Sequence, residues 1–246
     1  MEPNTIEPGA ARRRRSGFAH VVGVALLVNA LAGAMNLSTV AAADAKAETG
    51  KPIHIVAFGD SLSAGYGLRP KDAFPTQLQK QLKAAGHNVV VSNGAVSGDT
   101  TADGLKRLDW AIPDGTDAVI LELGGNDALR GIDPKQTRAN LEKIIAALKQ
   151  RKIPILLAGM LSPANWGDHY SEDFDKIFPD LAREHGLVFY PFFLEGVVFE
   201  PKLNLDDGMH PSGKGIAEIV KRILPSVEQL IARAAAQPPG PAAPKS

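Results

Sequence analysis

The sequence of 246 residues contains no cysteine. This absence excludes disulfide bonds, metal sites built from thiolates and a cysteine nucleophile. Because no covalent crosslink can form, the stability of the fold has to come from its packed core. The apolar fraction of 44% is ordinary for a globular protein and is enough for one sizeable core, so a single folded domain is expected.

An excess of charge of either sign is also missing. The chain has 27 basic and 27 acidic residues, and a cut near residue 45 would leave 23 basic and 24 acidic ones, since it removes four arginines and three acids. A protein so close to neutral has no general attraction for nucleic acid or for an anionic surface. Nucleic acid is therefore not expected as a partner.

Charged side chains are absent from residues 17–43, directly after four consecutive arginines at 12–15. The apolar residues 21–28 and the small residues at 40–45 are typical of an export signal. We therefore predict a signal peptide over residues 1–45 and a mature protein that is periplasmic or secreted. The alternative is a retained membrane anchor, because the uncharged stretch approaches bilayer thickness. Its alanine and glycine content favours cleavage, which would leave no stable membrane span.

The other end of the chain, residues 235–246, contains repeated prolines and lacks apolar periodicity. Such a segment can neither continue a helix nor bury an apolar face, so we predict a disordered tail. The folded domain is then expected over residues 51–234.

Within this domain, short apolar runs with the length of a strand alternate with segments that have helical apolar spacing. The expected strands are Ile53–Phe58, Val89–Val91, Ala118–Leu123, Ile155–Met160 and Leu187–Phe192. The expected helices are Phe74–Ala84, Thr101–Trp110, Pro134–Gln150, Ser171–Glu184 and a last one from Pro211 to about Arg233. Pro225 is expected to break or kink the last helix.

The alternation of helices with almost continuously apolar strands indicates a parallel sheet that is covered on both faces. We predict an α/β fold, a three-layer α/β/α sandwich with a flavodoxin-like five-stranded parallel sheet. In such sheets ligands bind beyond the carboxyl ends of the strands. Polar residues that follow strands are therefore the candidates for a functional site.

Four polar clusters follow expected strands: Gly59–Ser63, Ser97–Thr100, Gly124–Asp127 and, after a long loop, Asp206–His210. Taken singly, each is a good sequence for a turn or a helix cap. Their joint placement at the strand ends favours a shared chemical role.

Acyl transfer is the chemistry that fits these clusters. A serine hydroxyl is a poor nucleophile until an imidazole accepts its proton, and the imidazole needs a carboxylate that fixes its tautomer. Ser61 supplies the hydroxyl, His210 the imidazole and Asp207, three residues earlier, the carboxylate. If residues 207–210 form a single turn, the last two side chains can meet.

An acyl transfer site also needs hydrogen-bond donors for the oxyanion of the tetrahedral intermediate. The candidates are the Ser61 N–H at a helix N-terminus, the Gly98 N–H and the Asn126 carboxamide. Gly94 competes with Gly98, since it also follows the second strand, and the Ser-Gly-Asp-Thr context favours Gly98.

Three acidic residues, Asp60, Asp99 and Asp127, adjoin these positions and raise the alternative of a metal site or a carboxylate pair. Aspartate at such places more often accepts hydrogen bonds from backbone N–H groups of turns. We therefore expect them to hold the loops, and we expect no metal.

The runs Gly59–Gly67, Ser97–Thr100, Leu121–Asp127 and Asp206–Pro211 together resemble the motifs of the SGNH, or GDSL, hydrolases over residues 53–230. The longer runs are similar to those of the bacterial thioesterase I, lysophospholipase L1 and arylesterase subgroup. The four blocks have the right order and compatible spacing, which makes the resemblance specific.

This resemblance implies that Ser61 is the nucleophile, that Asp207 and His210 complete a triad, and that Ser61, Gly98 and Asn126 donate to the oxyanion. It also implies an exported enzyme without a cofactor that hydrolyses small-molecule acyl esters or thioesters. The preference between these substrates and the oligomeric state stay open.

Apolar side chains near the last strand exceed what one strand can bury. As a hypothesis, Phe193, Leu194 and Pro163 line a site for an acyl chain or an aromatic ring. The alternative is that they only pack their loops.

Two other functions are consistent with the same fold. One is removal of acetyl groups from polysaccharide by the same chemistry. The other is a flavodoxin-like binding module whose glycine turns hold a phosphate, which is disfavoured because no Gly-x-Gly-x-x-Gly or P-loop run is present. The Gly-x-Ser-x-Gly motif is missing too, so an open groove is expected in place of the lidded pocket of α/β-hydrolases.

Overall fold

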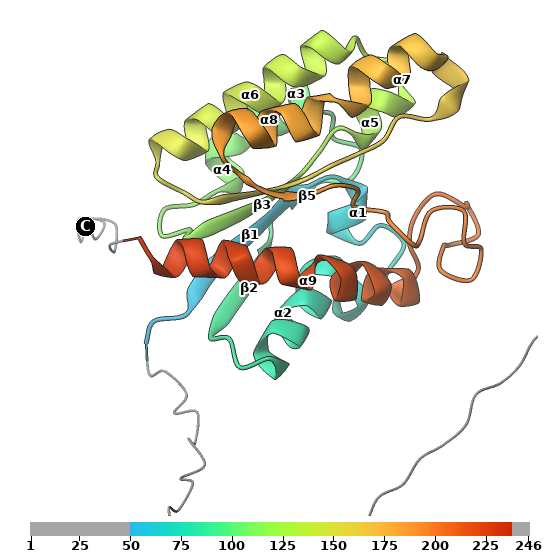
Figure 1. The fold of residues 1–246 in the computed structure, drawn as a ribbon. Helices are drawn as coiled ribbons and strands as arrows, with labels where there is room; N and C mark the ends of the chain where they lie inside the picture. Colours follow the sequence, from blue (N-terminus) through green and yellow to red (C-terminus); the bar gives the residue numbers. More distant parts are fainter. Residues whose placement is uncertain (1–49, 238–246) are drawn as a thin grey trace, which may run out of the picture. The chain divides into compact units, whose positions relative to one another are not determined.

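The computed structural model describes residues 50–237, and its centre is a sheet of five parallel strands (Figure 1). The sheet order is β2-β1-β3-β4-β5. The strands are β1 (Ile53–Gly59), β2 (Val89–Asn93), β3 (Ala118–Glu122), β4 (Ile155–Ala158) and β5 (Val188–Tyr190). All five predicted strands are present, and the last three end earlier than expected.

Helices cover both faces of this sheet (Figure 1). One face carries α2 (Phe74–Ala84) and α9 (Gly213–Ala235), which pack side by side. The other face carries α3 (Thr101–Lys106), α4 (Leu108–Ala111), α6 (Pro134–Gln150) and α8 (Ile177–His185). The predicted three-layer α/β/α arrangement is confirmed.

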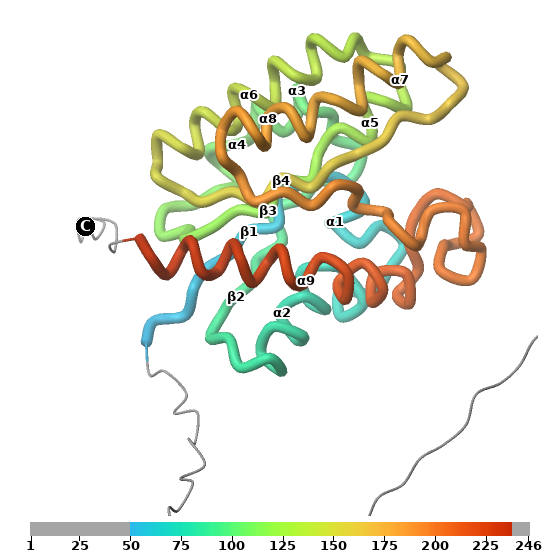
Figure 2. The backbone as a smooth tube through the Cα atoms, viewed as in Figure 1, coloured from blue at the N-terminus to red at the C-terminus, as the bar shows by residue number. Residues whose placement is uncertain are grey.

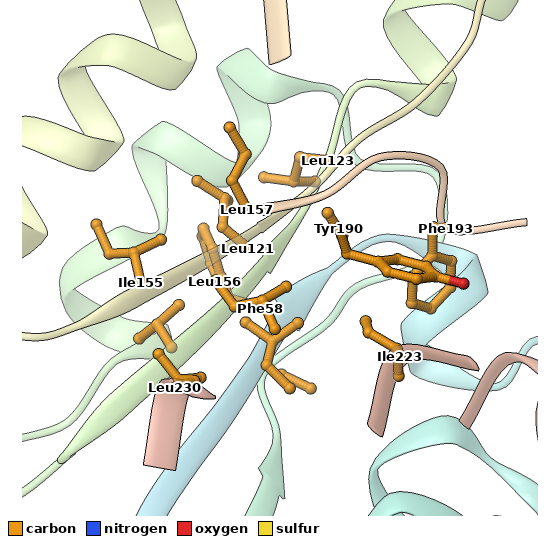
Figure 3. Packing of buried hydrophobic residues seen from close by; sticks show 14 of the residues in the cluster. Phe58, Leu121, Leu123, Ile155, Leu156, Leu157, Tyr190, Phe193, Ile223 and Leu230 are labelled. Carbon is orange, nitrogen blue, oxygen red and sulfur yellow. The ribbon is translucent and has the colours of Figure 1, made fainter. Parts of the chain in front are cut away.

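Apolar side chains fill the spaces between the layers (Figure 3). β3 is buried along its whole length, as expected for a central parallel strand with helices on both faces. On α6, the predicted stripe of Leu141, Ile144, Ile145 and Leu148 is fully buried. This helix begins as expected, because Asp133 caps the Lys135 N–H and proline occupies the first turn.

Two predicted helices are divided in the structure. The segment expected over Thr101–Trp110 forms α3 and α4, which meet at Arg107. The segment expected over Ser171–Glu184 forms α7 (Asp168–Asp175) and α8. Pro179 lies in the first turn of α8, where its missing N–H is tolerated but where it could not continue α7.

The expected break at Pro225 is wrong. Helix α9 runs through this residue without interruption. Proline removes one backbone hydrogen bond, but the buried side chains of Ile219, Ile223 and Val227 on either side hold the helix against the sheet.

The loop of residues 191–212 lies beyond the same end of the sheet as α1 (Ser61–Ala64) (Figure 2). The predicted signal peptide at residues 1–45 and the tail from residue 238 onward lie outside the described residues. No helix within residues 50–237 has both the length and the apolar character needed to cross a membrane.

Candidate active site

Ser61 is the first residue of the short helix α1 and follows β1 through a tight turn. Asp60 caps this helix, since its Oδ1 accepts the Leu62 N–H at 3.0 Å. The turn requires glycine at position 59, because an added Cβ would lie 2.4 Å from Oε2 of Glu122. The close approach of β1 and β3 thus places the Ser61 hydroxyl at the carboxyl edge of the sheet.

The structure brings Ser61, His210 and Asp207 together. His210 Nε2 lies 3.0 Å from Ser61 Oγ, and His210 Nδ1 lies 2.7 Å from Asp207 Oδ2. The loop before α9 therefore extends to the end of β1, and residues distant in sequence form one hydrogen-bonded chain. These distances are those of a nucleophile, a base and a carboxylate that orients the base.

The carboxylate of Asp207 is held in its ionised form by the backbone. Its Oδ1 accepts the N–H groups of His210 and Met209, each at 2.9 Å. These two bonds, followed by the bond with the His210 ring, lower the pKa of Asp207 to about 2. Gly208 has a φ of 68°, a left-handed conformation that this turn requires and that glycine adopts readily.

The ring of Tyr66 packs against the imidazole of His210. Its ring centroid lies 4.5 Å from that of His210, and the ring planes are tilted by 36°. Sequence reasoning missed this residue. The available signal was its position between Gly65 and Gly67, both with positive φ, in a turn that follows the nucleophile.

Two of the expected oxyanion donors are free. Within residues 50–237, neither the Ser61 N–H nor the Gly98 N–H donates to a protein group. Gly98 has a φ of 87°, and no atom would lie within 4 Å of an added Cβ, so the space beside it is open. The N–H of the competing Gly94 instead donates to the Ala57 carbonyl at 2.9 Å. The geometry therefore favours Gly98 over Gly94.

Asn126, the third expected donor, connects the two loops. It lies in α5 (Gly125–Leu129), and its Nδ2 donates to Asp60 Oδ2 and to the Asp99 carbonyl, both at 3.0 Å. Its carboxamide is thereby fixed between the turn of Ser61 and the loop of Gly98.

A buried pair of carboxyl groups lies beneath the serine turn. Burial raises the pKa of Asp60 to about 6. Burial and the neighbouring Asp60 raise the pKa of Glu122 well above its usual range. Glu122 Oε2 accepts the Ser63 hydroxyl at 2.7 Å, whereas its buried Oε1 has no partner. Both effects favour the neutral form of Glu122, a property that sequence reasoning missed although an acid at the end of an apolar strand was visible.

The acidic neighbours of the site hold its loops, partly as expected. Asp127 is buried and accepts the N–H of Thr101 at 2.8 Å and the hydroxyl of Thr137 at 3.1 Å. Asp99 differs, since it pairs with Arg107, whose guanidinium also donates to the Gly59 carbonyl. Residues 50–237 contain no group of three or more histidine or acidic side chains placed to hold a metal ion.

The expected substrate lining is wrong at Phe193. This side chain is 0% exposed and packs edge-on against Phe74 at 5.1 Å, inside the core (Figure 3). The chain turns after β5 so that the Phe193 N–H bonds the Gly159 carbonyl at 2.9 Å and the ring points inward. Leu194 also packs against the core, and Pro163 is partly exposed at the start of a short 3-10 turn.

Other apolar side chains are exposed on α5 and on the loop after β4. Leu129 is 48% exposed and follows Asn126 by three positions on α5, so the two lie on the same side of that helix. Leu161 and Trp166, from the loop after β4, are about half exposed as well. Trp166 is fixed by a 2.8 Å bond from its Nε1 to the Ala128 carbonyl of α5.

Residues 57–217 match the model of the GDSL-like lipase/acylhydrolase family. The chain is 40% identical over 174 residues to an arylesterase of Vibrio mimicus, which covers 69% of this chain and 87% of the relative. It is 39% identical over 159 residues to thioesterase 1/protease 1/lysophospholipase L1 of Escherichia coli strain K12, covering 64% and 75% of the two chains.

Solved structures are similar over the same region. The crystal structure of TesA has a TM-score of 0.68 and 34% identity, covering 72% of this chain and 99% of that one. That of AlinE4, an SGNH-hydrolase family esterase, has a TM-score of 0.63 and 44% identity, covering 73% and 97%.

The buried Glu122 predicts how the free energy of unfolding depends on pH. A carboxyl whose pKa is raised by folding keeps its proton in the folded state while the unfolded chain loses it, so stability falls as pH rises above about 4.5. Glu122→Gln should make this slope smaller, and the part that remains comes from Asp60, whose pKa is also raised by burial. Between pH 5 and pH 8, the stability of the variant should therefore rise relative to that of the unchanged protein, as measured by urea unfolding.

The matched control is Glu142→Gln on α6, where the side chain is exposed and should leave the slope unchanged. An identical pH slope for Glu122→Gln and the unchanged protein would contradict a raised pKa of Glu122.

Proposed function

The chain belongs to the GDSL-like lipase/acylhydrolase family, and on this premise we propose that it is a carboxylic ester hydrolase in which Ser61 is the nucleophile, His210 the base and Asp207 the residue that orients His210. The resemblance predicted from the motifs is confirmed by the family match and by the named relatives. The single observation that carries the proposal is the hydrogen-bonded chain from Ser61 through His210 to Asp207.

The first half of the reaction forms an acyl-enzyme. Ser61 Oγ attacks the carbonyl carbon of the substrate, and His210 Nε2, 3.0 Å away, accepts the hydroxyl proton. Asp207 stabilises the imidazolium that results, because its carboxylate faces Nδ1. Collapse of the tetrahedral intermediate expels the alcohol or thiol, which takes its proton from His210.

The second half repeats these steps with water. His210 accepts a proton from a water molecule, and the hydroxide attacks the acyl-serine carbonyl. The second tetrahedral intermediate then releases the carboxylic acid, and Ser61 regains its proton from His210. The cycle uses only side chains of this protein and water, and no cofactor takes part in a step.

The oxyanion of both intermediates is bound by the N–H groups of Ser61 and Gly98 and by the Asn126 carboxamide. The two N–H groups are free to donate, and Asn126 exchanges one of its present bonds for a bond to the oxyanion. The two N–H groups are preorganised and stabilise the charge that develops in the transition state without reorganisation at that moment.

Ester and thioester substrates pass through the same oxyanion, so both are within the proposed activity. The names of the relatives, an arylesterase and a thioesterase 1/lysophospholipase L1, support aryl esters, acyl thioesters and lysophospholipids as the substrate classes to test.

The test of the nucleophile is turnover of a p-nitrophenyl ester by Ser61→Ala. Removal of the attacking oxygen should lower kcat by at least about a thousandfold, while the circular dichroism spectrum stays unchanged. Ser92→Ala, an exposed serine of β2, is the matched control and should keep full activity. Turnover by Ser61→Ala at the rate of the unchanged protein would contradict the mechanism.

We propose that the acyl chain lies against Leu129, since this exposed side chain is on the Asn126 side of the site. Leu129→Ala removes apolar surface worth about 1 kcal/mol to a long acyl chain. The value of kcat/KM for an eight-carbon acyl ester should fall roughly fivefold, while that for the acetyl ester should stay constant. The control is Trp110→Ala, which removes an exposed apolar side chain on α4 and should leave both values unchanged. An equal fall in kcat/KM for both esters in Leu129→Ala would contradict a contact between Leu129 and the acyl chain.

Export is a further part of the proposed function. The arginines at 12–15, the apolar stretch and the small residues near 45 support a cleaved signal peptide and a periplasmic or secreted enzyme. The N-terminal residue of the protein recovered from the producing bacterium should lie close to residue 45. Recovery of the full chain from the membrane fraction would instead indicate a retained anchor.

A further inference from the structure

A concave surface that no triad residue lines lies between α2 and the beginning of α9. It is a groove of about 880 Å³, a size that accommodates a small-molecule ligand. The 3-10 turn Pro70–Asp72, helix α2, the loop before α9 and the first turn of α9 all contribute to it. Helices α2 and α9 lie side by side on one face of the sheet (Figure 1).

The charges along this groove are nearly all positive. Arg69 is paired with Asp72 at 2.9 Å, and Asp72 is the only acidic residue of the lining. The four lysines that remain, Lys71, Lys80, Lys202 and Lys214, are exposed. None of them takes part in an ion pair within residues 50–237. We call these four residues and their surface the lysine groove.

Such a concentration of charge is unexpected in a chain with 27 basic and 27 acidic residues. Like charges that line one cleft repel each other and focus a positive potential into it, which favours an anionic occupant. The beginning of α9 adds to this potential, because its helix of 23 residues directs its positive end toward the groove at Gly213 and Lys214. The occupant that fits is a phosphate group.

The lysine groove adjoins the triad. Ser212 lines it and follows His210 by two residues, so their Cα atoms lie within about 7 Å of each other. Gln77 fixes this junction, since its Nε2 donates to the carbonyls of Asp72 and Gly213 at 2.8 and 2.9 Å. The end of the groove at Ser212 therefore lies close to His210 along the chain.

The side of the triad on which the groove lies decides which part of the substrate enters it. His210 gives its proton to the leaving alcohol or thiol, so the leaving group has to lie beside the imidazole. The oxyanion donor Asn126 and the exposed Leu129 belong to α5, whereas the lysine groove begins at Ser212, two residues after His210. A phosphate bound there belongs to the leaving group and not to the acyl chain.

We propose that the lysine groove is a binding site for the phosphate of the leaving group in substrates whose alcohol or thiol carries one. Coenzyme A thioesters and lysophospholipids both meet this description. The inference rests on the proposed roles of Ser61 and His210, which determine the leaving-group side. It adds a specificity site that the reaction chemistry alone does not require.

The test compares leaving groups at a constant acyl chain. The variant changes Lys71, Lys80, Lys202 and Lys214 to Gln, and the substrates are octanoyl coenzyme A, octanoyl glycerol 3-phosphate and the neutral p-nitrophenyl octanoate. The value of kcat/KM for at least one of the two phosphate-bearing substrates should fall at least about tenfold, and that for the neutral ester should stay within about twofold. Added salt should lower kcat/KM of the unchanged protein for the same phosphate-bearing substrates, because it screens the attraction between charges.

The control variant carries the same net charge. It changes Lys106, Lys135, Lys143 and Lys149, which are exposed on α3 and α6 on the opposite face, to Gln. An equal loss in the control, an equal loss for the neutral ester, or no loss for either phosphate-bearing substrate would each overturn the proposal. Turnover of the neutral ester by every variant monitors the triad itself, so failure of the groove and failure of Ser61 give different results.

Two inhibitors distinguish the sources of the phosphate. Coenzyme A and glycerol 3-phosphate are each added to the neutral ester assay. Competitive inhibition by coenzyme A that is lost in the lysine variant indicates a nucleotide carrier, and the same result with glycerol 3-phosphate indicates a lipid headgroup. Inhibition by neither compound, or inhibition that the lysine variant retains, would contradict a phosphate site.

Discussion

The buried carboxyl group of Asp60 is the constraint on which the rest of the site depends. One of its oxygens caps the helix that begins with Ser61, and the other accepts the Asn126 carboxamide, which also reaches the loop of Gly98. Burial raises the pKa of Asp60 to about 6, because the charged carboxylate is poorly solvated there. At neutral pH the folded protein keeps this charge at a cost in stability. The buried carboxylate of Asp60 thus lowers the stability of the fold, while its hydrogen bonds fix the positions of the nucleophile and of Asn126.

The sheet and the larger helices could be predicted because their apolar periodicity reflects burial directly. The α6 helix, with its cap, first-turn proline and four buried residues, is the clearest example. The site residues could be placed because parallel strands bring their carboxyl ends to one edge. Phe193 could not be placed, since its direction is set by the turn after β5 and not by a repeating pattern. The continuity of α9 through Pro225 depends on tertiary packing in the same way.

The lysine groove shows a different limit of sequence reasoning. Overall neutrality argued against an anionic partner, yet four lysines at positions 71, 80, 202 and 214 gather on one surface when α2 and α9 pack together. The net charge of a chain does not show where its charged side chains lie in the fold. The raised pKa of Glu122 could not be predicted for a related reason, because it depends on burial beside Asp60, which only the fold creates.

The most direct test of the central claim is covalent labelling of Ser61. The intact protein is treated with an alkyl fluorophosphonate, which reacts with a serine activated by a neighbouring imidazole, and the product is examined by mass spectrometry of the whole chain and of its peptides. The account predicts one adduct per chain, on Ser61, together with loss of esterase activity and no adduct after His210→Ala. An adduct on another residue, or full activity after complete labelling of Ser61, would contradict it.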